Sequence, residues 1–216
     1  MAPADFTKMK SERGQSLIEA VLSIAIISMV AFGFLALSRQ SLANVKTVNL
    51  ELSGQNLAAE NLRVLSSKGF AFWADFFSQA GPSVNFMLVK PEFDSTATFR
   101  QNNWQIASDN ELTISNEAQA EQILNDNFAA LSGGADLRLF YDVNGFLTVK
   151  ETASPSPFYR SSAAYLICFN EQREPIVCPS AQMPLAAGIG FISQVRFQYF
   201  NEWHGVTLKS GIYDWQ

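Results

Sequence analysis

Gly14-Gln15-Ser16-Leu17-Ile18-Glu19-Ala20 begins an apolar run that continues to Leu37. Residues 20–37 carry no charge, whereas the short leader before the run carries Lys8, Lys10 and Arg13. As a helix that rises about 1.5 Å per residue, residues 17–37 would be roughly 31 Å long. This length is close to the hydrocarbon thickness of a bilayer, so the run is long enough to span a membrane.

Glu19 is unusual because it lies inside the apolar run. An ionised carboxylate within a membrane costs about 3 kcal/mol even on insertion scales, so such a residue generally has a partner and a function. No basic residue follows it within two helical turns. Cleavage between Gly14 and Gln15 would supply a partner, because the new α-amino group would be a cation with a pKa of about 7.7–8.0. This ammonium group could pair with Glu19 within one chain or between packed subunits.

The basic leader, Gly14, the spaced Glu19 and the long apolar run together resemble the processing site of type IV prepilins and pseudopilins. In that family, a membrane peptidase cuts after the glycine and methylates the new N-terminal amine. The glutamate of the family guides docking into a growing filament. The resemblance implies that Gly14 precedes the cut, that Gln15 becomes the methylated N-terminus, and that Glu19 is the assembly carboxylate. Gln15 departs from the family pattern, in which Phe or Met is usual.

The resemblance also implies partners and a location. The chain would be a structural subunit, of the minor pilin type, in a type IV pilus (a fimbrium), a type II secretion pseudopilus or a DNA-uptake filament. Its partners would be other pilin subunits, the prepilin peptidase, an inner-membrane assembly platform and, before assembly, membrane lipid. The basic leader places the N-terminus in the cytoplasm and the domain outside the inner membrane. After assembly, the domain would belong to an extracellular or periplasmic filament.

Two other interpretations of the N-terminus remain open. A secretory signal peptide has an apolar segment of about 7–15 residues and a small-residue cleavage site, for which Ala36-Leu37-Ser38 would serve. An uncleaved signal anchor explains the length of the run but not the combination of Gly14 with Glu19. The competing functions are a membrane-anchored exported binding module, which would be adhesin-like, and an anchored exported enzyme. The binding module would use residues 70–77 or the cysteine loop as its contact surface.

Charge and motifs argue against nucleic-acid binding and against catalysis. The net charge is −5, and it becomes −6 without the leader, which holds three basic and two acidic residues. No nucleic-acid partner is therefore expected for the domain. The single histidine, His204, is expected in a surface turn at residues 201–205. The sequence holds no nucleophile motif, phosphate-binding glycine loop or cluster of metal ligands, so we expect no catalytic residue, metal site or cofactor.

A long helix is expected to connect the apolar run to the rest of the chain. Residues 1–14 would form the cleaved leader, residues 15–38 the transmembrane and assembly helix, and residues 39–68 its amphipathic continuation. Gly33 and Gly54 are weak points where this helix could bend, and Gly69 is the expected C-terminal stop. The continuation has apolar residues at roughly helical spacing, which include Leu42, Val45, Leu52, Leu57, Leu62 and Leu65.

Residues 69–216 are expected to form one globular domain with an antiparallel β-sheet. A helix is expected at residues 116–131, with a start at Asn116 and Gln119 that resembles a capping box. Asn144-Gly145 predicts a hairpin, Ser154-Pro155-Ser156-Pro157 a break in the chain, and the aromatic residues 70–77 a seam between helix and sheet. Expected strands cover residues 86–89, 96–106, 137–143, 146–150, 163–169, 191–200 and 206–208. The fold class is therefore α+β, with the long helix packed on the sheet as in the lollipop shape of pilins.

Cys168 and Cys178 are the only cysteines. In an exported domain, a pair at this spacing predicts a disulfide that closes a loop. In the chain-entropy view, such a bond would contribute roughly 2–3 kcal/mol. A metal site is not expected here, because two thiols and one distant histidine do not provide four ligands.

Overall fold

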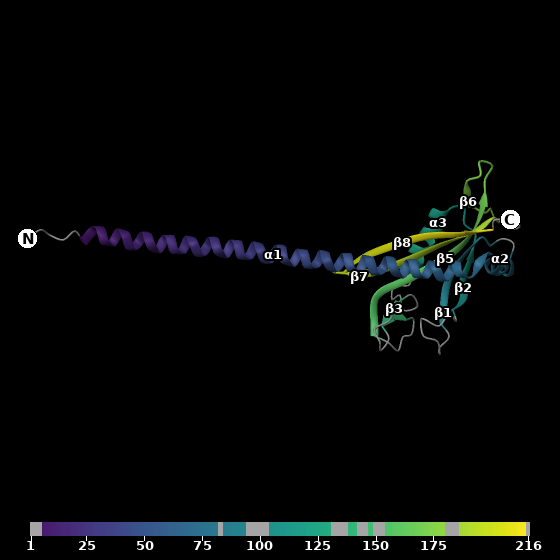
Figure 1. Cartoon of the computed structure of the whole chain (residues 1–216), viewed down its shortest axis with the longest axis horizontal. Coiled ribbons are helices and arrows are strands. Elements are labelled where there is room, and N and C mark those ends of the chain that lie inside the picture. The colour runs from purple at the N-terminus through teal and green to yellow at the C-terminus, as the bar shows by residue number, and fades with distance from the viewer. Residues whose placement is uncertain are drawn as a thin grey trace, which may run out of the picture. The chain divides into compact units, whose positions relative to one another are not determined.

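The computed structural model describes residues 6–81, 84–93, 104–130, 138–141, 147–148, 154–179 and 186–214. The chain divides into two compact units, Met1–Asn49 and Leu50–Gln216. The helices are α1 (Phe6–Ser67), α2 (Gly69–Ala80) and α3 (Glu117–Ala130). The strands are β1 (Phe86–Phe93), β2 (Trp104–Leu112), β3 (Arg138–Tyr141), β4 (Leu147–Thr148), β5 (Ser154–Phe169), β6 (Pro175–Val177), β7 (Gly188–Tyr199) and β8 (Glu202–Tyr213), as Figure 1 shows.

A single helix of 62 residues, α1, leads into the domain. The expected weak points at Gly33 and Gly54 do not interrupt it. It ends at Ser67, and Gly69 follows with φ = 77°, a left-handed conformation that glycine adopts without strain. Gly69 therefore ends α1 as expected, but it also begins α2, which the sequence analysis did not predict.

The C-terminal part of α1 packs on the sheet through one face. Leu65 belongs to the same buried cluster as Ile189 of β7, and Leu57 to the same cluster as Val195. The packed part of α1 and β7 therefore run alongside each other in opposite directions. The buried residues of this face recur every three or four positions, as expected for a helix with one side against a core. They are Gly54, Leu57, Ala58, Asn61, Leu62 and Leu65.

Asn61 is the polar member of this apolar face. It is fully buried, and its side-chain amide donates hydrogen bonds to the hydroxyl of Ser162 on β5 and to that of Ser193 on β7, the latter at 3.0 Å. Ser162 and Ser193 are cross-strand partners. One amide thus joins α1 to two neighbouring strands. Because hydrogen bonds are directional, this contact fixes both the rotation of α1 and its position along the sheet.

Among the described residues, eight strands form one sheet in which all pairs are antiparallel. β5 is the central strand, because it pairs with β1, β3, β6 and β7. β8 pairs with the other side of β7. Leu166 of β5 lies in a cluster with residues of α1 and α2, whereas Tyr165 lies in a cluster with residues of α3. The helices therefore cover opposite faces of the sheet. The α+β prediction, with a long N-terminal helix packed on an antiparallel sheet, is confirmed.

The predicted break at residues 154–157 is wrong, because Ser154-Pro155-Ser156-Pro157 begins β5. The first β5 residue paired with β7 is Phe158, so both prolines precede that ladder. Proline lacks the N–H that a strand paired on both sides would need, but it is tolerated where one side is unpaired. β3 pairs with the other side of this segment, through Phe140 and Pro155.

The predicted turn at residues 201–205 is also wrong. Tyr199 pairs with Glu202, so the connection between β7 and β8 is only Phe200-Asn201, with φ values of 49° and 64°. His204 therefore lies in β8, not in a surface turn. Its ring stacks on that of Phe197 with centroids 5.4 Å apart.

Other local predictions differ mainly in extent. The aromatic residues 70–77 form part of α2, where Trp73 and Phe77 are buried between helix and sheet, as the seam prediction implied. The expected strand at 86–89 extends to Phe93, and that at 96–106 is described from Trp104 to Leu112, with residues 96–103 outside the described range. The cysteine loop contains a short strand, β6, which pairs with β5.

Two local predictions hold in detail. At the start of α3, the N–H of Gln119 donates to the side-chain oxygen of Asn116 at 2.9 Å, and the N–H of Ser115 donates to the side-chain oxygen of Gln119, also at 2.9 Å. The first bond is that of a capping box, whereas the second reaches the N–H of Ser115, one residue before the N-cap, instead of that of Asn116. β3 and β4 form the antiparallel pair expected on either side of Asn144-Gly145, although that turn and Asp142 lie outside the described residues.

Gly54→Ala should raise the free energy of unfolding by about 0.5–1 kcal/mol, because alanine is the better helix former. The site admits the methyl group: a Cβ there would lie 3.5 Å from Val206 and 3.7 Å from Phe197, which are ordinary contact distances. Thermal unfolding of the full chain in detergent would show a higher Tm. As a control, Gly54→Leu should lower the Tm, since the longer side chain meets β7 and β8. A lower Tm for the alanine variant would contradict the packing described here.

Candidate functional site

The predicted processing residues lie in the first part of α1. The backbone of Gly14 and Gln15 is helical, and the side chain of Gln15 lies outside the described residues. Glu19 follows one turn later with an exposed side chain, and its carbonyl accepts a hydrogen bond from the Ser23 hydroxyl at 2.8 Å. The carbonyl of Glu19 is thus bonded within α1, and its side chain is exposed.

The surface of α1 after Glu19 is almost entirely apolar. All large apolar side chains of residues 17–37 are exposed, with exposed fractions from 54% for Leu35 to 78% for Met29. Within the part of the chain that the structure describes, α1 is the one helix long and apolar enough to cross a membrane, judged by length and composition. Apolar surface of this extent is unfavourable in water, at about 25 cal/mol per Å². It therefore requires lipid or protein around it.

The apolar surface continues beyond the run itself. Leu42, Val45, Val48 and Leu52 are exposed by 52–70%. The sequence analysis predicted Leu42, Val45 and Leu52 as part of the face that packs on the domain. The prediction is wrong for Leu52, which belongs to the unit of the domain and is exposed, and it stays a prediction for Leu42 and Val45, which belong to the other unit.

The predicted disulfide is present: Cys168 at the end of β5 is bonded to Cys178, which follows β6. β5 and β6 pair antiparallel between the two cysteines, so the bond closes a short hairpin. Both cysteines are buried in the cluster that holds Leu65 and Trp73. The disulfide therefore anchors this hairpin to the layer formed by α1 and α2.

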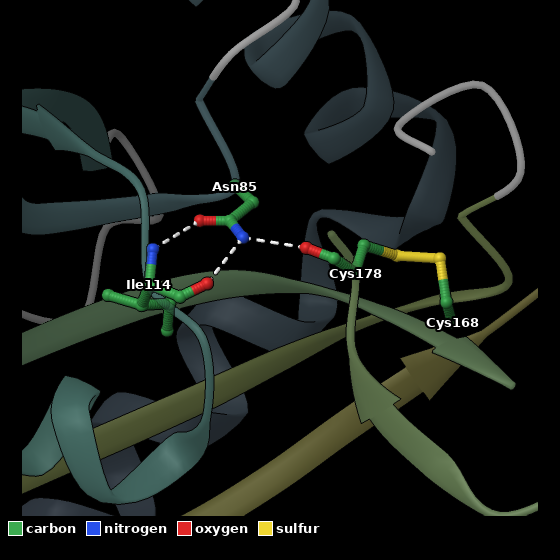
Figure 2. The surroundings of a disulfide bond; sticks show 4 residues. All are labelled: Asn85, Ile114, Cys168 and Cys178. Atoms are coloured by element: carbon green, nitrogen blue, oxygen red, sulfur yellow. Dashed lines mark hydrogen bonds between the residues drawn. A yellow bond between two sulfur atoms is a disulfide. The ribbon is translucent and has the colours of Figure 1, made fainter. Parts of the chain in front are cut away.

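Asn85, just before β1, forms hydrogen bonds both to this hairpin and to Ile114, which lies between β2 and α3, as Figure 2 shows. Its side-chain amide donates to the carbonyls of Cys178 and Ile114, at 2.6 and 2.8 Å, and its side-chain oxygen accepts from the N–H of Ile114 at 2.8 Å. Asn85 is fully buried. The residue thus satisfies three backbone groups in the interior, which would otherwise lack partners away from water.

A charged pair lies at the boundary between α1 and the sheet. Arg160 of β5 is buried, and burial lowers the pKa of its guanidinium group to about 10, an effect that nearby Glu60 of α1 partly opposes. Burial also raises the pKa of Glu60, while Arg160 acts in the opposite direction. Each charge therefore makes burial of the other less unfavourable, which adds an electrostatic link between α1 and β5.

The face of the sheet that carries α3 holds a pocket of about 210 Å³. The Tyr165 hydroxyl donates to Glu117 at 2.6 Å, and the Lys209 ammonium lies 2.9 Å from Glu117 and 2.6 Å from Glu121. These hydrogen bonds lower the pKa of Glu117 and raise that of Lys209, and burial together with the Glu117 bond raises the pKa of Tyr165. The pocket lining includes Tyr165, Ile167, Ile176, Lys209, Gly211 and Tyr213.

Gly190 on β7 makes room for the Tyr165 ring, and Gly211 on β8 lines the pocket. Gly190 pairs with Tyr165 on one side and with Gly211 on the other. The Tyr165 ring lies over Gly190 so closely that a Cβ there would come within 2.2 Å of it. Sequence analysis did not find this site, because it depends on the register of three strands. The sequence did contain one signal for this site, the alternating glycines Gly188 and Gly190 in β7. Glycine within a strand often marks a place where another group approaches the backbone closely.

The predicted site residues thus fall into two separate groups. Gly14, Gln15 and Glu19 lie along the first turns of α1, whereas Cys168 and Cys178 lie in the domain and serve its structure. Among the described residues, no cluster of three or more potential metal-ligating side chains occurs. Comparison of the chain with protein-family models, curated proteins and solved structures finds no match.

Asn85→Ala should lower the free energy of unfolding by about 3 kcal/mol or more, because it leaves the buried N–H and C=O of Ile114 and the C=O of Cys178 without this partner. Chemical denaturation with the disulfide intact would measure the loss. Asn170→Ala is the matched control: its side-chain oxygen accepts from the N–H of Glu174 at 2.8 Å in the exposed part of the same hairpin. That variant should lose less than about 1 kcal/mol. Equal losses would contradict the role given to Asn85.

Proposed function

We propose that this chain is a structural subunit of a type IV pilus or a related pseudopilus, processed by a prepilin peptidase after Gly14. The observation that carries the proposal is the exposed apolar surface of residues 17–37 with one carboxylate, Glu19, near its start. A surface of this kind suits both lipid and a bundle of similar helices. The leader, the glycine and the spaced glutamate agree with the prepilin resemblance.

In the proposed mechanism, α1 first holds the subunit in the inner membrane and then enters a filament of like helices. Its Leu, Ile, Val and Phe side chains remain in apolar surroundings throughout, so the transfer requires little change in apolar hydration. The domain does not need to rearrange, because the α1 side chains that pack on it begin at Leu50, after the run.

In this mechanism, Glu19 sets the axial position of one subunit relative to its neighbour. In lipid or in a helix bundle, its carboxylate is surrounded by apolar side chains, where an uncompensated charge is unfavourable. The α-amino group created at Gln15 of a neighbouring subunit is the cation that would compensate it. Since only one position along the helix satisfies the charge, the pair would set how far one subunit moves past the next.

Intact mass and N-terminal peptide mapping of the protein from its native membrane test the processing step. We expect a chain that begins at Gln15, with or without one added methyl group. A chain that still begins at Met1, or one that begins after Ser38, would rule out the filament subunit.

Glu19→Ala should leave membrane insertion and cleavage intact but should reduce incorporation into filaments at least several-fold, because the register charge is lost. Quantitative immunoblotting of sheared filaments against the membrane fraction would measure the effect. Glu51→Ala provides the control, because Glu51 is an exposed carboxylate of the same helix outside the apolar run. Normal incorporation of the Glu19 variant would remove the assembly role from this residue.

The alternative function is a membrane-anchored exported binding module that does not polymerise. The pocket beside Tyr165 and the exposed Ile176 of the cysteine loop favour it. Residues 70–77 offer less contact surface, since Trp73 and Phe77 are buried and Phe72 is 40% exposed. Such a module would retain its anchor in the membrane and would capture a ligand through its domain alone, without any filament partner.

A further inference from the structure

Gln15 is the residue at which cleavage after Gly14 creates a new N-terminus. The cut turns the backbone nitrogen of Gln15 into a primary amine, while the side chain of the same residue ends in a carboxamide. Because both groups belong to one residue, they can react with each other without a neighbouring side chain. Phe and Met, which are usual at this position in the resembled family, offer no such reaction. Gln15 therefore adds chemistry to the processing site.

The reaction is a ring closure that needs no co-reactant. The neutral α-amine of Gln15 attacks the carbonyl carbon of its own side-chain amide, and a bond forms between that carbon and the α-nitrogen. The bond from the same carbon to the amide nitrogen breaks, and this nitrogen leaves as ammonia with a proton from the amine. No atom is oxidised or reduced. The product is pyroglutamate, a five-membered lactam whose nitrogen is uncharged, so the N-terminal cation is lost.

The processed helix has no second cation that could replace this amine. The three basic residues of the leader leave with it, and residues 16–38 contain no lysine, arginine or histidine. The next basic residue, Arg39, follows Glu19 by twenty positions. Because α1 is one unbroken helix across this stretch, the two residues are separated by roughly 30 Å along its axis. Ring closure at Gln15 thus leaves Glu19 without a cationic partner in its own helix.

Glu19 is placed to slow the ring closure. Residues four positions apart on a helix are neighbours on one face, so the Glu19 carboxylate can reach the amine of its own chain or that of a packed subunit. Its side chain is exposed, and the Ser23 hydroxyl bonds to its carbonyl rather than to its carboxylate. Only the neutral amine is a nucleophile, and roughly a tenth of an unpaired α-amine is neutral at pH 7. An amine that is ion-paired with a carboxylate keeps its proton and does not attack.

We propose that Gln15 of the processed chain closes to pyroglutamate unless Glu19 holds its amine as an ammonium ion, so that unassembled subunits lose their capacity to pair with time. The inference rests on the proposed function, because it requires cleavage after Gly14. In a filament, apolar surroundings strengthen the ion pair, whereas water at the membrane surface weakens it. Ring closure would therefore retire subunits that stay in the membrane and spare those already assembled.

The masses of N-terminal peptides during a chase test this proposal. Synthesis is stopped in cells that express the full-length chain, and samples are taken from the membrane fraction and from sheared filaments. Free amines are blocked at harvest by isotopic reductive methylation, so that ring closure during handling is not counted. In the membrane fraction, we expect a growing share of the peptide that begins at residue 15 to have lost one ammonia. In filaments, this share should be at least several-fold smaller.

Gln15→Asn is the matched control for the ring closure. Asparagine retains the carboxamide but is one methylene group shorter, so the same attack would have to form a strained four-membered ring. No loss of ammonia is expected from this variant, and its chains should enter filaments until later in the chase.

Glu19→Ala tests the protection of the amine. Processed chains of this variant lack the carboxylate that holds the ammonium ion, so the cyclised share of the membrane fraction should rise several-fold at early times. Glu51→Ala removes an exposed carboxylate elsewhere on the same helix and should leave that share unchanged.

Processed chains in the membrane that keep an open Gln15 throughout the chase would overturn the proposal. Equal cyclised shares in membrane and filaments, or in the unaltered and Glu19→Ala chains, would also overturn it. Failure of the proposed function is recognised separately, because the N-terminal peptide would then retain residues 1–14 or begin after Ser38. A chain that begins at residue 15, enters filaments and never loses ammonia would overturn this inference alone.

Discussion

The packing of the C-terminal part of α1 on β5 and β7 is the contact on which the rest of the structure depends. Apolar side chains such as Leu62 and Leu65 provide most of the buried surface, and Asn61 adds directional bonds to Ser162 and Ser193. Hydrophobic burial alone would allow α1 to slide or rotate, because it is not directional. The buried amide removes that freedom and so ties the direction of α1 to the direction of the β7–β8 ribbon.

The helix therefore has two regions with different requirements. One face of residues 57–65 is buried by the domain, whereas the large apolar residues from Leu17 to Val48 are exposed in the chain by itself. The first region is satisfied within one copy, whereas the second leaves a large apolar surface exposed. Because no buried residue of the domain depends on residues 17–37 within the described structure, the environment of that segment can change while the domain remains folded.

Local predictions succeeded where neighbours in the sequence decide the structure. The cap at Asn116 and Gln119 and the disulfide between Cys168 and Cys178 follow from short spacings, and both are confirmed. The predicted break at residues 154–157 and the turn around His204 failed for a different reason. Whether a proline or a glycine ends a strand depends on which side of that strand is paired, and here that is decided by the pairs of Phe140 with Pro155 and of Arg196 with Gly205.

The sequence by itself determined the apolar run, the place of Glu19 within it, the α+β class and the disulfide. These features depend on composition, periodicity and spacing along the chain, which a single sequence displays directly. Only the tertiary structure revealed the bonds of Asn85, the pocket beside Tyr165 and Gly211, and the exposure of Phe200. These features require the register of distant strands, because side chains far apart in sequence become neighbours only when the sheet forms.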